Sequence, residues 1–139
     1  MTFEVISHKG AGPARFGMRP TEVKTAINLP FDSFKRDENQ AHPCDSFNDD
    51  LFAYYDADGK AEAFEFFQPT RVTWNGKELF GMSFGELVEQ VRNLDPTIVV
   101  DSSGFTSFAL GIGASAPDPE EQSAEPAESI IAFTRGYYD

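Results

Sequence analysis

One place in the sequence brings a histidine, a cysteine and an acid together, His42-Pro43-Cys44-Asp45. A cysteine nucleophile needs a base within hydrogen-bond reach and an electropositive setting that favours the thiolate. Here a proline stiffens the chain between histidine and cysteine, and the neighbouring residues are acidic. We therefore interpret Cys44 as an ordinary loop cysteine. The only other histidine is His8, so the chain has too few histidine and cysteine ligands for a typical zinc site at Cys44.

A second stretch, Asp56-Ala57-Asp58-Gly59, has the first residues of a calcium-binding loop. The full pattern needs a third ligand before the glycine and a glutamate at the twelfth position. Glycine directly follows Asp58 here, and position 67 is phenylalanine. An Asp-Gly turn at the tip of a hairpin explains these residues without a metal.

The remaining chemistry-bearing patterns are weak. Gly111-Ile112-Gly113 is followed by an acidic proline-rich segment, without the lysine and helix start that hold a phosphate. We therefore predict no metal, no cofactor and no enzymatic activity. Two alternatives stay open: a carboxylate pair, joined by His42, acting in a groove between two halves of the chain, and a small-molecule site within a phenylalanine-rich core.

Composition places the chain among globular proteins. It has 139 residues, a net charge of −12, 14 phenylalanines and a single cysteine. A lone cysteine suits a reducing compartment, and no signal peptide or membrane-spanning apolar run is visible, so we predict a cytoplasmic protein. The negative charge repels nucleic acid and anionic membranes, and it would steer a basic protein partner.

The strongest pattern is a repeat, G-x-x-x-F-G-M-x-x-x-E-[VL], at residues 12–23 and 76–87. In the second copy Ser83 and Glu86 form a capping box at a helix start. In the first copy Pro20 suits the first helical position, and Glu22 lies three residues past the cap. Both copies predict the end of a strand, a turn at the glycine, and a methionine in the core before a helix.

Apolar residues at helical spacing follow each copy, and Pro30 and Pro96 mark the helix ends. After the first helix, residues 51–67 predict a hairpin; after the second, residues 105–113 and 129–135 predict the equivalent strand pair. Residues 71–80 predict a tight hairpin, because Asn-Gly suits a type I′ turn. Residues 114–128, rich in proline, alanine and acid, predict a mobile acidic loop.

These elements predict an α+β fold of two repeated units, about residues 1–69 and 70–139. Each unit is a helix followed by an antiparallel β-meander, with the helices packed on one sheet or on two. A unit of about 65 residues is marginal alone, so we expect both to share the core of one compact domain, residues 1–139. The pattern predicts neither the strand order nor the oligomeric state.

The entry motif at residues 15–23, followed by Leu29-Pro30, resembles the opening of small α+β domains of the SmpA/OmlA type and of the tandem units of β-lactamase-inhibitor proteins. The whole chain also resembles bacterial immunity proteins encoded beside polymorphic toxins. That likeness lies in the paired Phe-Gly-Met entries, residues 72–80 and residues 128–138. It implies a protein that binds a toxin domain, covers its active site and performs no chemistry of its own.

An acidic inhibitor would associate quickly with a basic toxin domain, through aromatic anchors set among carboxylates. The predicted partner-binding residues are Tyr54, Tyr55, Asp56, Asp58, Asp118, Glu120, Glu121, Tyr137, Tyr138 and Asp139. Because neighbouring residues of a strand point to opposite faces, we expect one of Tyr54 and Tyr55 to lie in the core.

Overall fold

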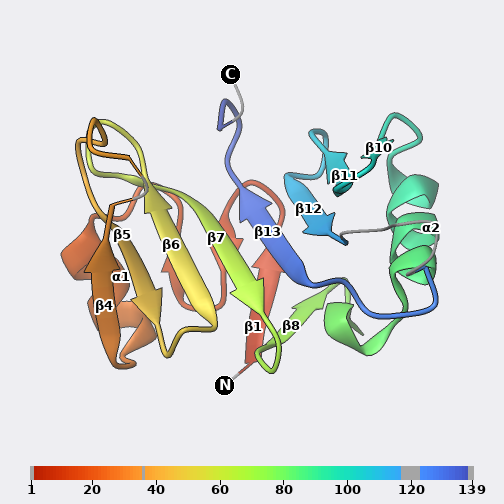
Figure 1. Cartoon of the computed structure of the whole chain (residues 1–139), viewed down its shortest axis with the longest axis horizontal. Coiled ribbons are helices and arrows are strands. Elements are labelled where there is room, and N and C mark those ends of the chain that lie inside the picture. The colour runs from red at the N-terminus through yellow and green to blue at the C-terminus, as the bar shows by residue number, and fades with distance from the viewer. Residues whose placement is uncertain (1, 36, 117–122, 138–139) are drawn as a thin grey trace.

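The computed structural model describes residues 2–35, 37–116 and 123–137. Within these ranges the chain forms two β-sheets and a few helices, which confirms the α+β class (Figure 1). The helices are α1 (Pro20–Ile27), α2 (Phe84–Leu94) and the short 3-10 helix η1 (Leu79–Gly81).

The smaller sheet has five strands in the order β3-β2-β1-β8-β9. Their bounds are β1 (Thr2–Ile6), β2 (Gly10–Ala11), β3 (Ala14–Arg15), β8 (Arg71–Trp74) and β9 (Lys77–Glu78). The central strand β1 pairs antiparallel with β2 and parallel with β8, where Phe3 lies opposite Val72. This sheet therefore joins segments from the two halves of the chain.

The larger sheet has eight strands in the order β10-β11-β12-β13-β7-β6-β5-β4, and every neighbouring pair is antiparallel. Their bounds are β4 (Phe31–Phe34), β5 (Cys44–Phe47), β6 (Leu51–Tyr55), β7 (Ala61–Phe67), β10 (Val99–Asp101), β11 (Gly104–Ser107), β12 (Ile112–Ser115) and β13 (Ser129–Phe133). Four of these strands follow α1 and four follow α2 along the chain. The last strand of each set, β7 or β13, lies at the centre, with Phe64 opposite Ala132.

The core is built from the facing sides of the two sheets together with the buried sides of α1 and α2. In Figure 1, β1 and β8 lie behind β7 and β13, so the viewer faces the side of the larger sheet that is turned away from the smaller one. We call that side the outer face and the opposite side the inner face. Phe64 and Phe66 of β7 point to the inner face, as the alternation with Glu65 predicted, and Ile130 and Ala132 of β13 join them in the core.

The start of each helix shows one half of the predicted side-chain capping. The Ser83 hydroxyl accepts a hydrogen bond from the amide of Glu86 at 3.2 Å. At the start of α1 the amide of Arg19 donates to the Glu22 carboxylate at 3.0 Å, so the Glu22 side chain caps this helix. In each case an orphan amide of the first turn gains a partner. Met82, which precedes the second helix, is partly buried against the core, like Met18 before the first.

Turn chemistry was also predicted correctly. Asn75 and Gly76 have φ of 51° and 76°, the left-handed values that a type I′ turn requires, and they join β8 to β9. The turn from β6 to β7 is closed by Asp56, whose Oδ1 accepts hydrogen bonds from the amides of Asp58 and Lys60, each at 2.9 Å. The two aspartates therefore shape a hairpin tip.

Several strands escaped sequence reasoning. The edge strands β4 and β10 are short or polar, so their alternation of apolar and polar residues is weak in the sequence. Strand β5 was not predicted either. Residues 105–113 are two strands rather than one, because the chain turns between Ser107 and Ile112, with Gly111 at φ 67°. Gly81 also differs from Gly17: it belongs to η1, whereas Gly17 has φ 90° and forms the expected turn.

The predicted acidic loop, residues 114–128, is partly structured. Ala114 and Ser115 complete β12, and Ala127 is buried. The carbonyls of Ser123 and Glu125 accept hydrogen bonds from the amides of Gly85 and Phe84 at the start of α2, at 2.9 and 2.7 Å. The residues between, 117–122, lie outside the described ranges. None of the helices described here is long and apolar enough to cross a membrane.

Candidate functional site

Strand β6 is apolar on both of its faces, which is unusual for a sheet covered on one side only. Leu51 and Ala53 point to the inner face and are buried in the core. Phe52 and Tyr54, which alternate with them, point to the outer face and join a second apolar cluster there. In an antiparallel sheet with one solvated face, polar residues would be expected at those two positions.

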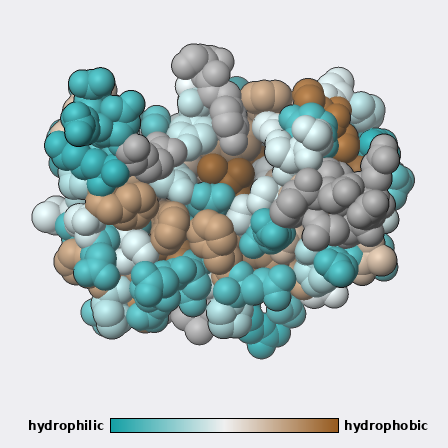
Figure 2. Space-filling model, in the orientation of Figure 1, coloured by the Kyte–Doolittle hydropathy of each residue, from teal (hydrophilic) through white to brown (hydrophobic). Residues whose placement is uncertain are grey.

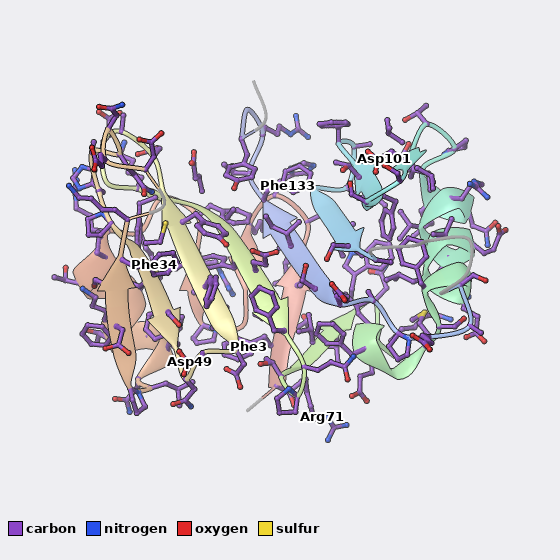
Figure 3. All side chains as sticks on the ribbon, viewed as in Figure 1. Phe3, Phe34, Asp49, Arg71, Asp101 and Phe133 are labelled. Carbon is purple, nitrogen blue, oxygen red and sulfur yellow. The ribbon has the colours of Figure 1, made fainter. Side chains whose placement is uncertain are left out.

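The outer face carries a group of aromatic rings, which we call the aromatic patch: Phe34, Phe52 and Phe67. Phe52 is at its centre, with ring centroids 5.4 Å from Phe34 and 5.0 Å from Phe67. All three are only partly buried. Figure 3 shows the side chains on this face, with Phe34 at one side and Phe133 near the middle of the sheet. In Figure 2 tan surface lies across the middle and left of the same face, between teal margins.

Near the middle of the sheet the rings continue. Phe133 of β13 is buried and stacks on Tyr137, with ring centroids 6.1 Å apart. Phe108, from the turn between β11 and β12, meets Phe133 edge-on at 6.3 Å and is 56% exposed. Aromatic rings therefore stand on the outer face in both halves of the chain.

The outer side of the smaller sheet is different. Its exposed residues include Thr2, Glu4, Arg15 and Arg71. Arg71 forms an exposed ion pair with Glu78 at 3.3 Å. Such a surface is suited to water, so the aromatic patch is a property of one face and not of the whole molecule.

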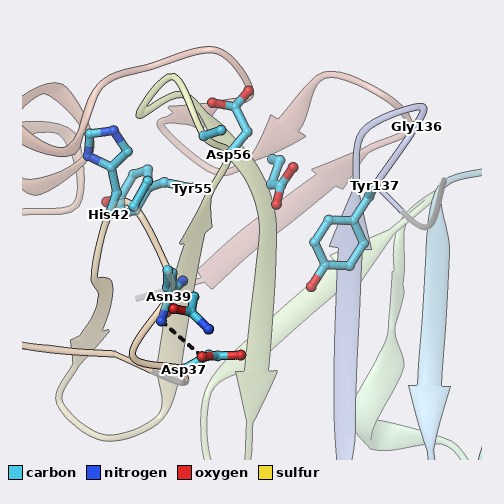
Figure 4. Close-up of a pocket in the computed structure, with 11 residues that line it drawn as sticks. Asp37, Asn39, His42, Tyr55, Asp56, Gly136 and Tyr137 are labelled. Atoms are coloured by element: carbon cyan, nitrogen blue, oxygen red, sulfur yellow. Dashed lines mark hydrogen bonds between the residues drawn. The ribbon is translucent and has the colours of Figure 1, made fainter.

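A pocket of about 600 Å³ opens at the end of the larger sheet, next to the aromatic cluster (Figure 4). The segment before β5 contributes Asp37 and His42, the turn after β6 contributes Asp56, and the chain after β13 contributes Tyr137. Figure 4 shows the Tyr137 ring facing His42, Tyr55 and Asp56 across the pocket. We call this the acidic pocket.

Glu62 enters the acidic pocket because β7 is irregular at this residue. Tyr54 lies opposite Ala63 and Tyr55 opposite Ala61, so Glu62 between them has no counterpart on β6. An extra residue of this kind forms a β-bulge, which turns a side chain away from regular alternation. Glu62 consequently lines the pocket together with Asp37 and Asp56.

The structure brings together three of the predicted partner-binding residues: Tyr55, Asp56 and Tyr137 line the acidic pocket. Asp58 is exposed at the hairpin tip, where its carbonyl accepts a hydrogen bond from Arg19 at 2.9 Å. Five more predicted residues, Asp118, Glu120, Glu121, Tyr138 and Asp139, lie outside the described ranges, and Tyr54 lies on the outer face of β6.

Both tyrosines of β6 are buried, although only one was expected to be. Tyr55 is 3% exposed on the inner face, and its hydroxyl donates to the buried carboxylate of Asp45 at 2.6 Å. Burial first, and then this hydrogen bond, raise the pKa of Tyr55 far above its usual value. Tyr54 is 5% exposed on the outer face because Phe52 and neighbouring side chains cover it.

The histidine and cysteine pair does not form a catalytic arrangement with Asp45. Cys44 is fully buried on the outer-face side of β5, and its sulfur accepts a hydrogen bond from Gln40 at 3.2 Å. Asp45, the next residue, points to the inner face, where Ser33 donates to it at 2.7 Å and Lys24 lies 3.7 Å away. His42 lies against Gly59 in the acidic pocket.

Sequence reasoning missed the aromatic patch and two carboxylates of the pocket, Asp37 and Glu62. The available signal was Leu-Phe-Ala-Tyr-Tyr at residues 51–55, which is apolar at every position rather than at alternate ones. No family model matches the sequence, and neither a curated protein nor a solved structure was found to be similar to it.

Proposed function

We propose that this chain is a protein-binding module that docks a basic protein partner on its outer face. The observation that carries the proposal is the aromatic patch, three partly exposed phenylalanine rings packed together on a sheet face that no layer of the described structure covers. Aromatic anchors of this kind supply much of the energy of protein interfaces.

Charge specifies the kind of partner. The chain carries a net charge of −12. Asp37, Asp56 and Glu62 line the acidic pocket, which shares Tyr137 with the aromatic rings of the outer face. A basic surface would be attracted over a long range and then oriented by these carboxylates.

The partner that best fits the sequence likeness is a bacterial toxin domain, with this chain as its immunity protein in the cytoplasm of the producing cell. Many toxin domains that act on nucleic acids need basic clefts, and an acidic protein covering such a cleft would block it without any chemistry of its own.

We also propose that the chain arose by tandem duplication of one unit, a helix followed by a four-stranded meander. Two features support this. The strands that follow each helix occupy opposite halves of the larger sheet, with β7 and β13 antiparallel at its centre. The amides near each helix start also bond to the segment around the beginning of that unit's last strand, Gly17 to Ala61 and Phe84 to Glu125.

The test is binding to the product of the neighbouring gene. Phe52→Ala should weaken the complex about 30-fold, because truncation of a central aromatic anchor removes about 2 kcal/mol. Thr73→Ala, on the outer side of the smaller sheet, should leave the affinity unchanged. Isothermal titration calorimetry measures both, and rising salt should weaken the wild-type complex. Equal effects of the two substitutions, or no binding by a neighbouring toxin-like product, would contradict the proposal.

A second candidate function is an enzyme acting in the acidic pocket. Its support is the meeting of His42 with Asp56 and Glu62 in one hollow between the first half of the chain and residues 136–137. A His42→Ala variant separates the two functions. If binding alone protects cells from the toxin, protection should persist as long as the complex forms. Loss of protection with an intact complex would favour the enzyme.

A further inference from the structure

Glu65 is a carboxylate placed where the two halves of the larger sheet meet. It lies on β7, opposite Ile131 of β13, and points to the outer face between the aromatic rings of the first half and the strands of the second. It is partly buried. A carboxylate at the centre of a largely apolar sheet face loses hydration and needs polar partners.

Hydroxyl groups supply those partners. The Tyr54 hydroxyl donates to Oε1 of Glu65 at 2.5 Å, and the Ser129 hydroxyl donates to Oε2 at 3.0 Å. Ser129 is itself buried, and its Oγ lies 2.6 Å from Oγ of Ser115. The network spans four adjacent strands, β6, β7, β13 and β12, so the orientation of the Glu65 carboxylate is set before any partner arrives.

The network leaves the negative charge of Glu65 without a cation. Both of its donors are neutral, and within the described part of the chain neither lysine nor arginine forms an ion pair with it. Each carboxylate oxygen has a second lone pair beyond the one used here. The structure therefore presents an oriented anion with remaining acceptor capacity.

Glu65 also borders a hollow of about 200 Å³ on the outer face. Asp101 and Thr106 contribute to its walls, as do Ser115, Ser129 and Ile131. The described residues of this wall include two carboxylates and several hydroxyls, with neither lysine nor arginine among them. Asp101 is held by the amide and hydroxyl of Ser103, each at 2.8 Å.

We infer that Glu65 is the specificity-determining carboxylate of the outer face and receives an arginine side chain of the protein partner in this hollow. A guanidinium has five donors in a fixed plane, enough to bond Glu65 while reaching the Ser115 hydroxyl or the Asp101 carboxylate. Its apolar stem would lie along Ile131. This inference rests on the proposed function, because it names the group through which the partner is recognised.

The experiment uses the whole chain and a small probe, N-acetyl-arginine-N-methylamide, with the citrulline analogue as an uncharged probe of the same shape. In two-dimensional amide NMR spectra, the arginine probe should shift the signals of Thr106, Ser115 and Ile131 in a saturable way, and the citrulline probe should not. Glu65→Gln should weaken arginine binding about fivefold or more. Glu4→Gln, the same charge change on the other sheet, should have no effect.

Equal shifts with the two probes, no shifts around the hollow, or unaltered arginine binding by Glu65→Gln would overturn the inference. If Glu65→Gln unfolds, as circular dichroism would reveal, Asp101→Asn at the exposed end of β10 replaces it, with an expected weakening of about twofold. Unaltered arginine binding by that variant would equally overturn it.

The outcome separates the inference from the function on which it rests. A partner complex that is sensitive to Phe52→Ala, together with absent arginine binding, overturns the role of Glu65 alone. Arginine binding in the hollow, together with a neighbouring gene product that does not bind the outer face, supports the site and overturns the proposed function.

Discussion

Each face of the eight-stranded sheet has a tyrosine that donates a hydrogen bond to a carboxylate, but the two carboxylates differ in their other partners. On the inner face Tyr55 donates to the carboxylate of Asp45, and Lys24 from α1 lies close enough to balance the charge. On the outer face the adjacent Tyr54 donates to the carboxylate of Glu65, which no described cation balances. The Asp45 carboxylate has both its hydrogen-bond donors and a cation within the fold. The Glu65 carboxylate is oriented by its donors but can still accept hydrogen bonds from a cationic group.

The apolar side chains show the same difference. Phe66 points inward and is fully buried, with its ring centroid 5.4 Å from that of Phe3 on the smaller sheet. Phe67 points outward and packs against Phe52 of the same sheet. Residues on the inner face stabilise the fold, whereas under the proposed function the exposed rings of the outer face contribute to association. Three substitution experiments can break or sharpen this distinction.

The largest difference should come from neighbouring phenylalanines of β7. Phe66→Ala should lower the free energy of unfolding by about 3–5 kcal/mol, because it leaves a cavity in a packed core. Phe67→Ala should lower it by about 1 kcal/mol, because that ring is partly exposed already. Urea denaturation monitored by circular dichroism measures both. Similar losses for the two variants would mean that the outer rings belong to the core.

An intermediate difference is expected for the adjacent tyrosines of β6. Tyr55→Phe should lower the free energy of unfolding by about 1–3 kcal/mol, because the Asp45 carboxylate is only 1% exposed and would lose a donor away from water. Tyr54→Phe should lower it by about 0.5–1.5 kcal/mol, since water can reach Glu65 more easily. Thermal and urea unfolding of both variants would show the order, and the reverse order would contradict the contrast.

The smallest effect concerns the pH dependence of a buried acid in the second half. Hydrogen bonds from Thr97, and then from Ser107, lower the pKa of Asp95 below its usual value. A lowered native pKa stabilises the fold above the ordinary carboxyl pKa of about 4, and this stabilisation is lost as pH falls through the native pKa. Asp95→Asn should therefore lower the melting temperature at pH 7.

The same variant has a defined behaviour in acid. The gap in melting temperature between Asp95→Asn and the wild type should narrow below about pH 4, where the wild type loses the contribution of its carboxylate. Ser107→Ala should reproduce part of the loss at pH 7, because its hydroxyl donates to Asp95 at 2.7 Å. A gap that widens in acid would show that the Asp95 carboxylate does not stabilise the fold.

Much of the local structure could be predicted from the sequence. Ser83 with Glu86 identified the start of α2, and Asn75 with Gly76 identified the β8–β9 turn, because caps and tight turns depend on a few adjacent residues. The edge strands β4 and β10 were not predicted, because no short local motif marks them. Their residues are mostly exposed, so burial leaves no alternating pattern in the sequence.

The candidate site was harder to predict because it depends on contacts between distant segments. The acidic pocket joins Asp37 and Glu62 with Tyr137, and the Glu65 network joins Tyr54 with Ser129 and Ser115. None of these pairings follows from spacing along the chain. Tyr137 could be chosen from the sequence for its residue type, but its neighbours become known only once β13 is placed beside β7.

Strand β1 has a consequence for the order in which this protein assembles. It completes a sheet with β2 nearby and with β8, half the chain away, through the parallel pairing of Thr2 with Arg71. During synthesis one flank of β1 stays unpaired until β8 has been made, because a long loop has to close before that pairing forms. Nascent chains would pass through a stage with an unprotected edge that neighbouring chains could capture, and rapid pairing of β8 with β1 would limit that risk.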